Sequence, residues 1–229
     1  MNHSLSRLLS VTAIGLAVAT PALADRVGDS YRELSAQWWQ WAISIPVPSN
    51  PLFDPTDPAS TVAVNCMVGQ RGSVWFLGGV TSSGVTRRSC SVPEGVTLFF
   101  PVINSINFDT PGVCGQVGTL TVPELRSFSA AFIDAASGLE AKLDNRRITH
   151  VRRVRSEVFA VATPTDSLFL APCLPAGIFS PAVDDGYYVK LEGLAPGIHT
   201  LEFKGKSGVF ELDVAYVLNV TPVSREVKR

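Results

Sequence analysis

The sequence has no surplus of charge of either sign. Its 19 lysines and arginines stand against 20 acidic residues, the formal net charge is −1, and only 17% of the residues are charged. Because neutralising a nucleic-acid backbone requires a clear cationic surplus, no nucleic-acid partner is expected. The 46% of hydrophobic residues can bury a substantial core, which argues against disorder over most of the chain.

Long hydrophobic runs are also lacking, except at the N-terminus. Arg7 precedes an apolar run of about 12 residues, Leu8 to Ala19, and Ala22-Leu23-Ala24 has the small-x-small pattern of a cleavage site. A membrane span needs about 20 apolar residues, so we predict a cleaved signal peptide over residues 1–24 and a single secreted β-rich domain over residues 25–229. This domain is expected to be periplasmic or extracellular, with no transmembrane segment; its oligomeric state stays open.

The predicted mature chain has few cysteines, namely Cys66, Cys90, Cys114 and Cys173. In an exported protein an even number of cysteines indicates disulfides. Three pairings are possible and the sequence does not choose among them; the nearest-neighbour pairing, Cys66 with Cys90 and Cys114 with Cys173, is our first expectation. No two cysteines are within 20 residues of each other, which argues against a zinc site. We assign no cofactor and no metal.

Two segments have the pattern of helices. Over residues 30–45, large apolar side chains recur at steps of three and four until Pro46; they are Tyr31, Leu34, Trp38, Trp41 and Ile45. Further along, Thr121 and Glu124 form a capping box, which predicts a helix that ends near Ser137 and Gly138.

Elsewhere the pattern is that of short strands and turns. Five prolines make residues 46–58 a stiff loop, and residues 96–103 are apolar on both faces, as in a central strand. Residues 187–192, 200–204 and 210–220 alternate apolar and polar side chains. We therefore predict a mainly β fold, an antiparallel β sandwich of jelly-roll or Ig-like type, with an N-terminal amphipathic helix and one inserted helix.

Several strings of residues together resemble a group of exported bacterial proteins of uncharacterised function. These strings are Trp38-Trp39-Gln40-Trp41, Gly72-Ser73-Val74-Trp75-Phe76-Leu77, Cys90-Ser91-Val92-Pro93, Leu98-Phe99-Phe100-Pro101-Val102-Ile103-Asn104, Asp185-Gly186-Tyr187-Tyr188 and the stretch from Leu194 to Phe203. The resemblance covers most of the predicted mature chain. It implies export and one domain, and it implies no particular chemistry.

The tryptophans are the first candidates for a ligand-binding site. Trp38, Trp39 and Trp41 lie on the first predicted helix, and with Trp75 they would form an aromatic platform for sugar rings or another apolar ligand. The alternative is that these large side chains pack in the core. Because Trp39 is about 100° round the helix from Trp38, the three indoles cannot all fill one slot, and we expect at least one near the surface.

Polar side chains after the strand that ends at residue 103 are the second candidates. Asn104, Asn107 and Asp109, with Gln70 and Gln116, would form a polar pocket for a hydroxylated ligand at the rim of a sheet. Alternatively, Asn104 and Asp109 would coordinate calcium through oxygen. The same residue types also serve simply as turn residues that bind their own backbone.

Histidines are scarce and one arginine cluster stands out. His199 is expected to be a satisfied core or turn residue. His150 lies among five arginines between residues 146 and 155. Such a cluster would contact anionic envelope polysaccharide or lipid head groups, or it would only protect a strand edge from aggregation.

Complete catalytic signatures are missing, since neither G-x-S-x-G nor H-E-x-x-H occurs. Our leading hypothesis is binding of a carbohydrate or cell-envelope component. A second hypothesis is an extracytoplasmic hydrolase of polysaccharide or ester with paired carboxylates, so whether the protein is an enzyme stays open; its candidates are Glu94, Asp109, Asp184 and Asp185, with His199 as base. A third is a structural envelope protein.

Overall fold

Two β-sheets and two α-helices make up the described part of the chain, residues 23–53, 62–81, 83–168 and 173–223, in the computed structural model of the protein. The six-stranded sheet A has the order β1 (Val62–Ala63), β3 (Gly84–Pro93), β11 (Phe210–Thr221), β10 (Gly197–Ser207), β5 (Ala136–Leu143) and β6 (Arg146–Arg147). Sheet B has the order β2 (Val74–Phe76), β4 (Thr97–Phe108), β9 (Gly177–Leu191) and β7 (Arg152–Arg155), and β8 (Phe159–Thr163) also pairs with β9. The predicted mainly β, sandwich-like fold with two helices is confirmed.

The two sheets are mixed, whereas the sequence pattern predicted antiparallel ones. The pairs β10–β11, β5–β10 and β4–β9 are antiparallel, but β3 runs parallel to β11 and β2 runs parallel to β4. The hairpins of the C-terminal third signalled the antiparallel pairs through their turns. Parallel neighbours come from distant parts of the chain and leave no such local signal.

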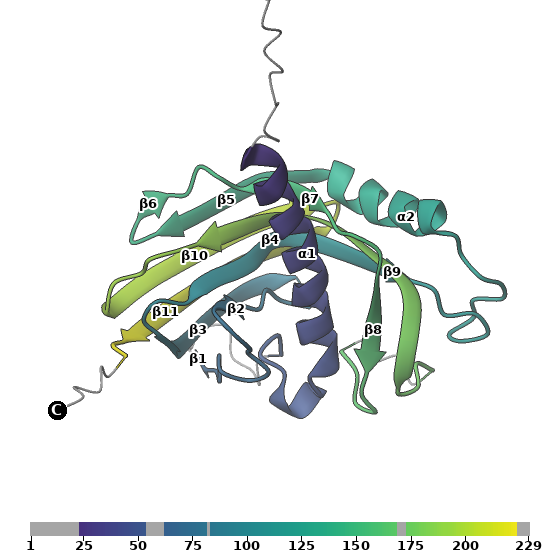
Figure 1. The fold of residues 1–229 in the computed structure, drawn as a ribbon, viewed down its shortest axis with the longest axis horizontal. Helices are drawn as coiled ribbons and strands as arrows, with labels where there is room; N and C mark the ends of the chain where they lie inside the picture. Colours follow the sequence, from purple (N-terminus) through teal and green to yellow (C-terminus); the bar gives the residue numbers. More distant parts are fainter. Residues whose placement is uncertain (1–22, 54–61, 82, 169–172, 224–229) are drawn as a thin grey trace, which may run out of the picture.

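The first helix, α1 (Leu23–Ser44), lies across the face of sheet B that points away from sheet A (Figure 1). It begins earlier than the predicted helix over residues 30–45 and ends at nearly the same place. Pro46 follows the helix, and the Asn50 side chain donates to the carbonyls of Ala42 at 2.8 Å and Ile45 at 3.0 Å. These bonds satisfy two of the acceptors that a helix C-terminus leaves open. A 3₁₀ turn, η1 (Val47–Ser49), begins the proline-rich loop.

The second helix, α2 (Val122–Asp134), packs on β4 and β9. Its predicted capping box is confirmed, since both the backbone N–H and the hydroxyl of Thr121 bind Glu124 Oε2, at 2.7 and 2.6 Å. The helix ends at Asp134, before the predicted end near Ser137 and Gly138. The reason is that the chain already pairs with β10 from Ala136 onward.

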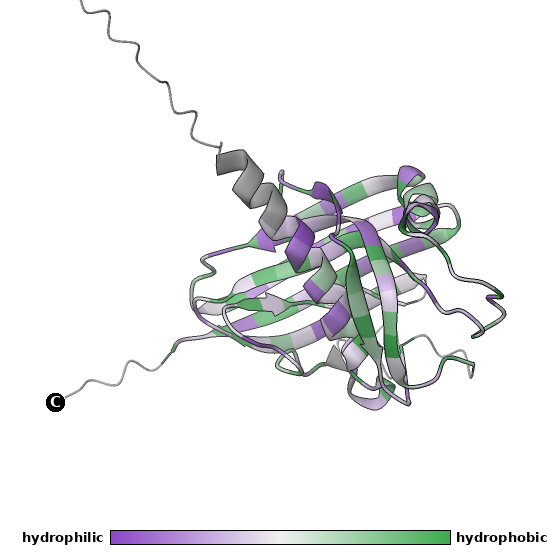
Figure 2. Cartoon of the chain, turned by 45° about the vertical axis from the view of Figure 1, so that its right-hand side comes forward, coloured by the Kyte–Doolittle hydropathy of each residue, from purple (hydrophilic) through white to green (hydrophobic). Residues whose placement is uncertain are grey.

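Sheet B has a hydrophobic core on each of its faces. One core fills the space between the two sheets and includes Phe100, Val189 and Phe203. The other lies between sheet B and α1 and includes Trp38, Phe99 and Tyr188. The predicted burial of both faces of the strand that ends at residue 103 is thereby confirmed. Hydrophobic and hydrophilic residues are interspersed along the strands (Figure 2).

A bulge in β4 decides which residues face α1. Phe99 and Asn104 are five positions apart, so in a regular strand their side chains would lie on opposite faces. The register with β9 shifts between Pro101 and Ile103, and one extra residue restores Asn104 to the face of Phe99. Proline within a strand is found at such bulges because it has no N–H to donate to the ladder.

Two disulfides connect loops to the sandwich. Cys66 is bonded to Cys90 of β3, and Cys114, after β4, is bonded to Cys173, before β9. The expected nearest-neighbour pairing is confirmed. The predicted signal peptide lies outside the described residues except for Leu23 and Ala24. Among the residues that the structure describes, we find no helix with the length and hydrophobicity of a membrane span.

Each disulfide is expected to stabilise the fold. The bridged cysteines are separated by 24 and 59 residues, for which loop-closure entropy gives about 3.5 and about 4 kcal/mol. The double variants Cys66→Ser/Cys90→Ser and Cys114→Ser/Cys173→Ser should each lose several kcal/mol in urea unfolding of the oxidised protein. Peptide mapping without reductant should recover the same two pairs. Unchanged unfolding midpoints, or a different pairing, would contradict this assignment.

Candidate functional site

The three tryptophans of α1 are all buried, so the expectation that one lies near the surface is wrong. Trp38, Trp39 and Trp41 are 1%, 7% and 6% exposed. Sheet B covers one side of the helix, and the turn that carries Gly69 together with Phe76 of the edge strand β2 covers a second side, where both contact Trp41. A helix enclosed on two sides can bury indoles that point in different directions.

Each of these indoles donates its N–H inside the protein. Trp38 donates to the carbonyl of Leu77 at 2.9 Å, and Trp41 donates to the carbonyl of Val68 at 2.8 Å. Trp39 donates to Oδ1 of Asp184 at 2.7 Å. Burial of an indole usually requires such a partner for its polar atom. The three tryptophans therefore anchor α1, and only part of their surface remains for a ligand.

A cavity of about 300 Å³ joins three of the predicted site residues, Trp38, Trp39 and Asn104. It lies between α1, the β4 segment after the bulge, the loop after β2, and the beginning of β11. Its wall is mostly apolar and comprises, besides those three, Leu52, Gly79, Val80, Thr81, Pro101, Ile103, Ser105, Ile106, Phe132, Leu168, Phe210 and Leu212. We call this cavity the α1–β4 pocket.

The other predicted site residues lie elsewhere and serve the local structure. Gln70 binds the carbonyls of Cys66 and Phe76 and the N–H of Phe76. Trp75 is part of the core between the sheets. Trp41 lines a separate groove with Gln37 and Gln40. These side chains resemble ligand-binding ones in sequence because carboxamides and indoles serve both purposes.

Asn107 and Asp109, which were predicted to lie with Asn104 at the rim of a sheet, also have structural partners. Asn107 donates to the Ser129 hydroxyl of α2 at 2.8 Å. Asp109 Oδ1 accepts from the Gln116 side chain and from the N–H of Leu120. Asn104 and Asp109 are about 16 Å apart along the strand, so the predicted alternative of a shared calcium ion is wrong.

A buried hydrogen-bond network holds the Asn104 side chain at the wall of the α1–β4 pocket. Asn104 Nδ2 donates to the Tyr188 hydroxyl at 3.0 Å, and this hydroxyl donates to Asp184 Oδ1 at 2.8 Å. Trp39 donates to the same oxygen. The remaining acceptor Oδ1 and the second N–H of Asn104 make no hydrogen bond with the described residues. They are available to a molecule in the pocket.

The carboxyl group of Asp184 lies in an environment that favours its neutral form. It is 1% exposed, and this burial raises its pKa to about 8, although hydrogen bonds from Trp39 and Tyr188 favour the charged form. Both donors bind Oδ1, and the Ser35 hydroxyl is a third group whose hydrogen bond favours the charged form. Burial outweighs all three. Burial also raises the pKa of Tyr188 well above its ordinary value.

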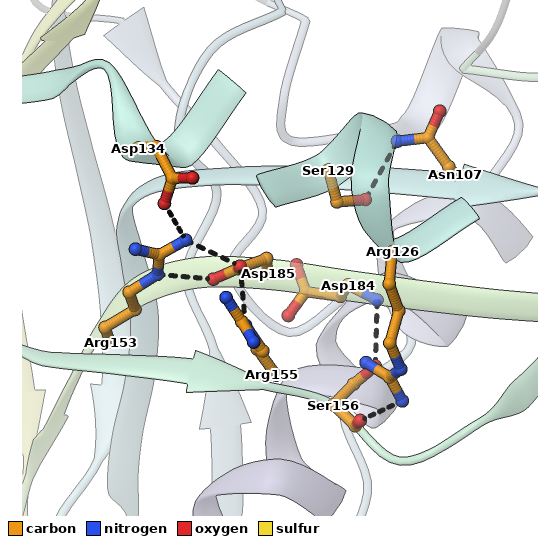
Figure 3. Close-up of polar contacts among 9 residues, drawn as sticks. All are labelled: Asn107, Arg126, Ser129, Asp134, Arg153, Arg155, Ser156, Asp184 and Asp185. Carbon is orange, nitrogen blue, oxygen red and sulfur yellow. Dashed lines mark hydrogen bonds and ion pairs between the residues drawn. The ribbon is translucent and has the colours of Figure 1, made fainter. Parts of the chain in front are cut away.

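Asp185, the next residue, has the opposite environment. Arg153 binds it through two bonds of 3.0 and 2.9 Å, Arg155 adds a third at 3.2 Å, and Arg153 also pairs with Asp134 of α2 at 2.6 Å (Figure 3). The two neighbours differ because adjacent strand residues point to opposite faces. Asp185 is thus a structural anchor between β7, β9 and α2.

The backbone around Asp184 is fixed as well. Its N–H donates to the Ser156 hydroxyl at 2.8 Å, and the Ser156 carbonyl accepts from Arg126 of α2 at 2.9 Å (Figure 3). Ser156, in the segment between β7 and β8, therefore connects Asp184 to α2.

The acids proposed for a hydrolase do not form a facing pair. Asp184 is buried and bound by Trp39, and burial raises its pKa. Asp185 is in ion pairs, Asp109 belongs to a loop, and Glu94 is exposed at the end of β3. The candidate base, His199, pairs with Asp144 at 2.8 Å and with the Ala195 carbonyl at 2.9 Å. As expected, it is a satisfied turn residue.

Sequence reasoning missed Gly186 and Tyr188 as site residues. Asp184, Gly186 and Tyr188 occupy alternate positions of β9 and thus share a face. A Cβ atom on Gly186 would lie 2.6 Å from Asn104 Cβ and 2.8 Å from Tyr188 Cε2, so only glycine allows Asn104 and Tyr188 to meet. The sequence did contain a signal for this site: an aspartate, a glycine and an aromatic residue occupy alternate positions on the face that points toward the core.

Comparison of the chain with family models, with curated proteins and with solved structures gave no match. The resemblance to exported bacterial proteins therefore stays a prediction.

The pKa of Asp184 predicts how stability responds to pH. Because the folded pKa is above the ordinary value of 3.8, the folded state binds one proton more than the unfolded state between about pH 4 and pH 8, and this site loses stability as the pH rises. Asp184→Asn removes this titrating group. In urea titrations the free energy of unfolding of the variant should rise relative to that of the wild type, by up to about 1.4 kcal/mol for each pH unit in this range. Parallel pH profiles of the two proteins would show that Asp184 is ionised.

Gly186 gives a second test. Gly186→Ala should cost about 1–3 kcal/mol in the free energy of unfolding, because the new methyl group overlaps Asn104 and Tyr188. Gly118→Ala is the matched control, since a Cβ at Gly118 meets nothing within 4 Å. Thermal and urea unfolding of both variants measure the difference, and equal stability would contradict the close approach.

Proposed function

We propose that this protein is an exported binding domain whose α1–β4 pocket holds the apolar part of a small cell-envelope component, with Asn104 as the hydrogen-bonding group for its polar end. The observation that carries the proposal is the meeting of Trp38, Trp39 and Asn104 in one cavity of about 300 Å³. Small-molecule sites have this character: mainly apolar walls, few polar groups and volumes of about 300–1,000 Å³.

Export is supported by two independent features. The N-terminal sequence has the pattern of a signal peptide. Both disulfides, Cys66–Cys90 and Cys114–Cys173, are of a kind that persists in oxidising compartments.

The chemistry of the wall favours an apolar ligand body. Side chains from four different elements contribute hydrocarbon surface, among them Ile106 of β4, Phe132 of α2 and Phe210 of β11. No acidic or basic side chain is among the described residues that line the cavity. Removal of apolar surface from water is then the main source of affinity.

The network behind Asn104 favours recognition of a polar end. Asp184 accepts from Tyr188 and orients its hydroxyl, and Tyr188 fixes one N–H of the Asn104 carboxamide. A group that is held in place before binding loses little conformational entropy when the ligand arrives. Asn104 can both donate to and accept from a hydroxyl or an amide of the ligand.

An open aromatic platform for sugar rings has less support. The indoles of α1 are at most 7% exposed, as Trp39 is, and the N–H of each is already bound. A sugar is therefore proposed only as the polar end of a ligand whose hydrocarbon part fills the pocket. We propose binding without hydrolysis, because no carboxylate of the described residues faces the cavity.

Three small probes separate the parts of this proposal. Calorimetric titration should detect binding of octyl glucoside, below the concentration at which it forms micelles, and of octanol, but not of glucose. Asn104→Leu should weaken octyl glucoside binding about fivefold, which corresponds to one hydrogen bond.

Asn219→Leu is the matched control, because it is the same substitution at a position on the exposed face of β11. It should bind the probes like the wild type. Failure of both octyl compounds to bind, or equal binding by the two variants, would overturn the proposal.

A further inference from the structure

A second hollow, of about 590 Å³, lies at the other end of sheet A, beside the β5–β6 hairpin. Its lining is Leu143, Asp144, Arg146, Arg147, Ile148, Thr149, His150 and Leu191. It shares no residue with the α1–β4 pocket. The lining combines two arginines, a histidine and a hydroxyl, which are groups that bind oxyanions.

The five arginines of the cluster fall into two groups. Arg153 and Arg155 bind the carboxylate of Asp185, and Arg152 stacks on the ring of Tyr31 at 5.4 Å from its centre. Arg146 and Arg147 are exposed, and they form no ion pair with any residue that the structure describes. Arg152, Arg153 and Arg155 thus have structural partners, whereas Arg146 and Arg147 do not have such a role.

The one acid of the hollow is already bound. Asp144 Oδ2 lies 2.8 Å from His199 Nδ1, and Asp144 Oδ1 accepts from the N–H of Thr200 at 2.9 Å. Both nitrogens of His199 face acceptors, the Asp144 carboxylate and the Ala195 carbonyl, and these hydrogen bonds raise the pKa of the imidazole. Asp144 is thus engaged with His199 and Thr200 and forms no ion pair with Arg146 or Arg147.

The hairpin gives the two arginines a fixed place. Asp144 and Asn145 form its turn with positive φ angles of 49° and 62°, the conformation that a two-residue hairpin requires. Arg146 and Arg147 then pair through their backbones with Leu143 and Lys142 of β5. Adjacent strand residues point to opposite faces, so the two side chains leave this short element on its two sides, and both residues line the hollow.

We propose that this hollow binds a phosphate group, with the guanidinium groups of Arg146 and Arg147 as its principal ligands and the Thr149 hydroxyl as a further donor. Planar guanidinium forks match the oxygens of phosphate. A phosphate ester in solution and the head group of an anionic phospholipid present the same chemistry, so the test has one arm for each.

Pyrophosphate is the soluble probe, and vesicles of phosphatidylglycerol, compared with vesicles of phosphatidylcholine, are the membrane probe. In low-salt buffer the wild-type protein should bind pyrophosphate by calorimetry, and Arg146→Gln/Arg147→Gln should weaken this binding about tenfold or more. Salt should weaken it as well. Sedimentation with phosphatidylglycerol vesicles alone, abolished in the same variant, would assign the phosphate to a lipid.

The control variant is Arg71→Gln/Arg87→Gln, which removes two exposed arginines from other places and gives the same net charge. It should bind both probes within about twofold of the wild type. The inference is overturned if the wild type binds neither probe, or if the control loses as much affinity as Arg146→Gln/Arg147→Gln, since that result indicates only net charge. Near-UV circular dichroism checks that both variants keep the fold.

Discussion

The burial of one carboxyl group between α1 and sheet B organises this molecule. Asp184 sits where the helix crosses β9, and its Oδ1 receives hydrogen bonds from Trp39 of the helix and Tyr188 of the same strand. A charged group there would face a large desolvation cost, so the acid takes up a proton. The neutral acid fixes two aromatic donors, and through Tyr188 it fixes Asn104 at the wall of the α1–β4 pocket.

Two backbone features make this arrangement possible. The bulge at Pro101–Ile103 turns Asn104 toward α1, and Gly186 leaves the space in which Asn104 and Tyr188 meet. Both lie on the central pair of sheet B, β4 and β9. The pocket therefore depends on strand register. Without the bulge, regular alternation would place Asn104 on the opposite face of the sheet. The phosphate site depends on a separate hairpin of sheet A and is independent of this register.

The sequence predicted the parts that local rules determine. Alternation at residues 210–220, the capping box at Thr121 and the amphipathic pattern around Trp38 all correspond to observed structure. The nearest-neighbour disulfide pairing is also observed, but the sequence did not choose it over the two other pairings. It did not predict the strand β3, the bulge, or the partners of Gln70 and Asn107, because these depend on residues distant in the chain. Trp38, Trp39 and Asn104 were identified by residue type, but their convergence follows from the flipped face after Pro101. The raised pKa of Asp184 follows from its burial, which the sequence alone does not show.

The central claim is that Asp184 is protonated in the folded protein at neutral pH. Carboxyl carbon-13 NMR of protein labelled at aspartate, with Asp184→Asn for assignment, measures this state directly. A protonated Asp184 should give the signal of a neutral acid at pH 7 and should titrate near pH 8. A carboxylate signal already at pH 5 would show that the buried group is ionised.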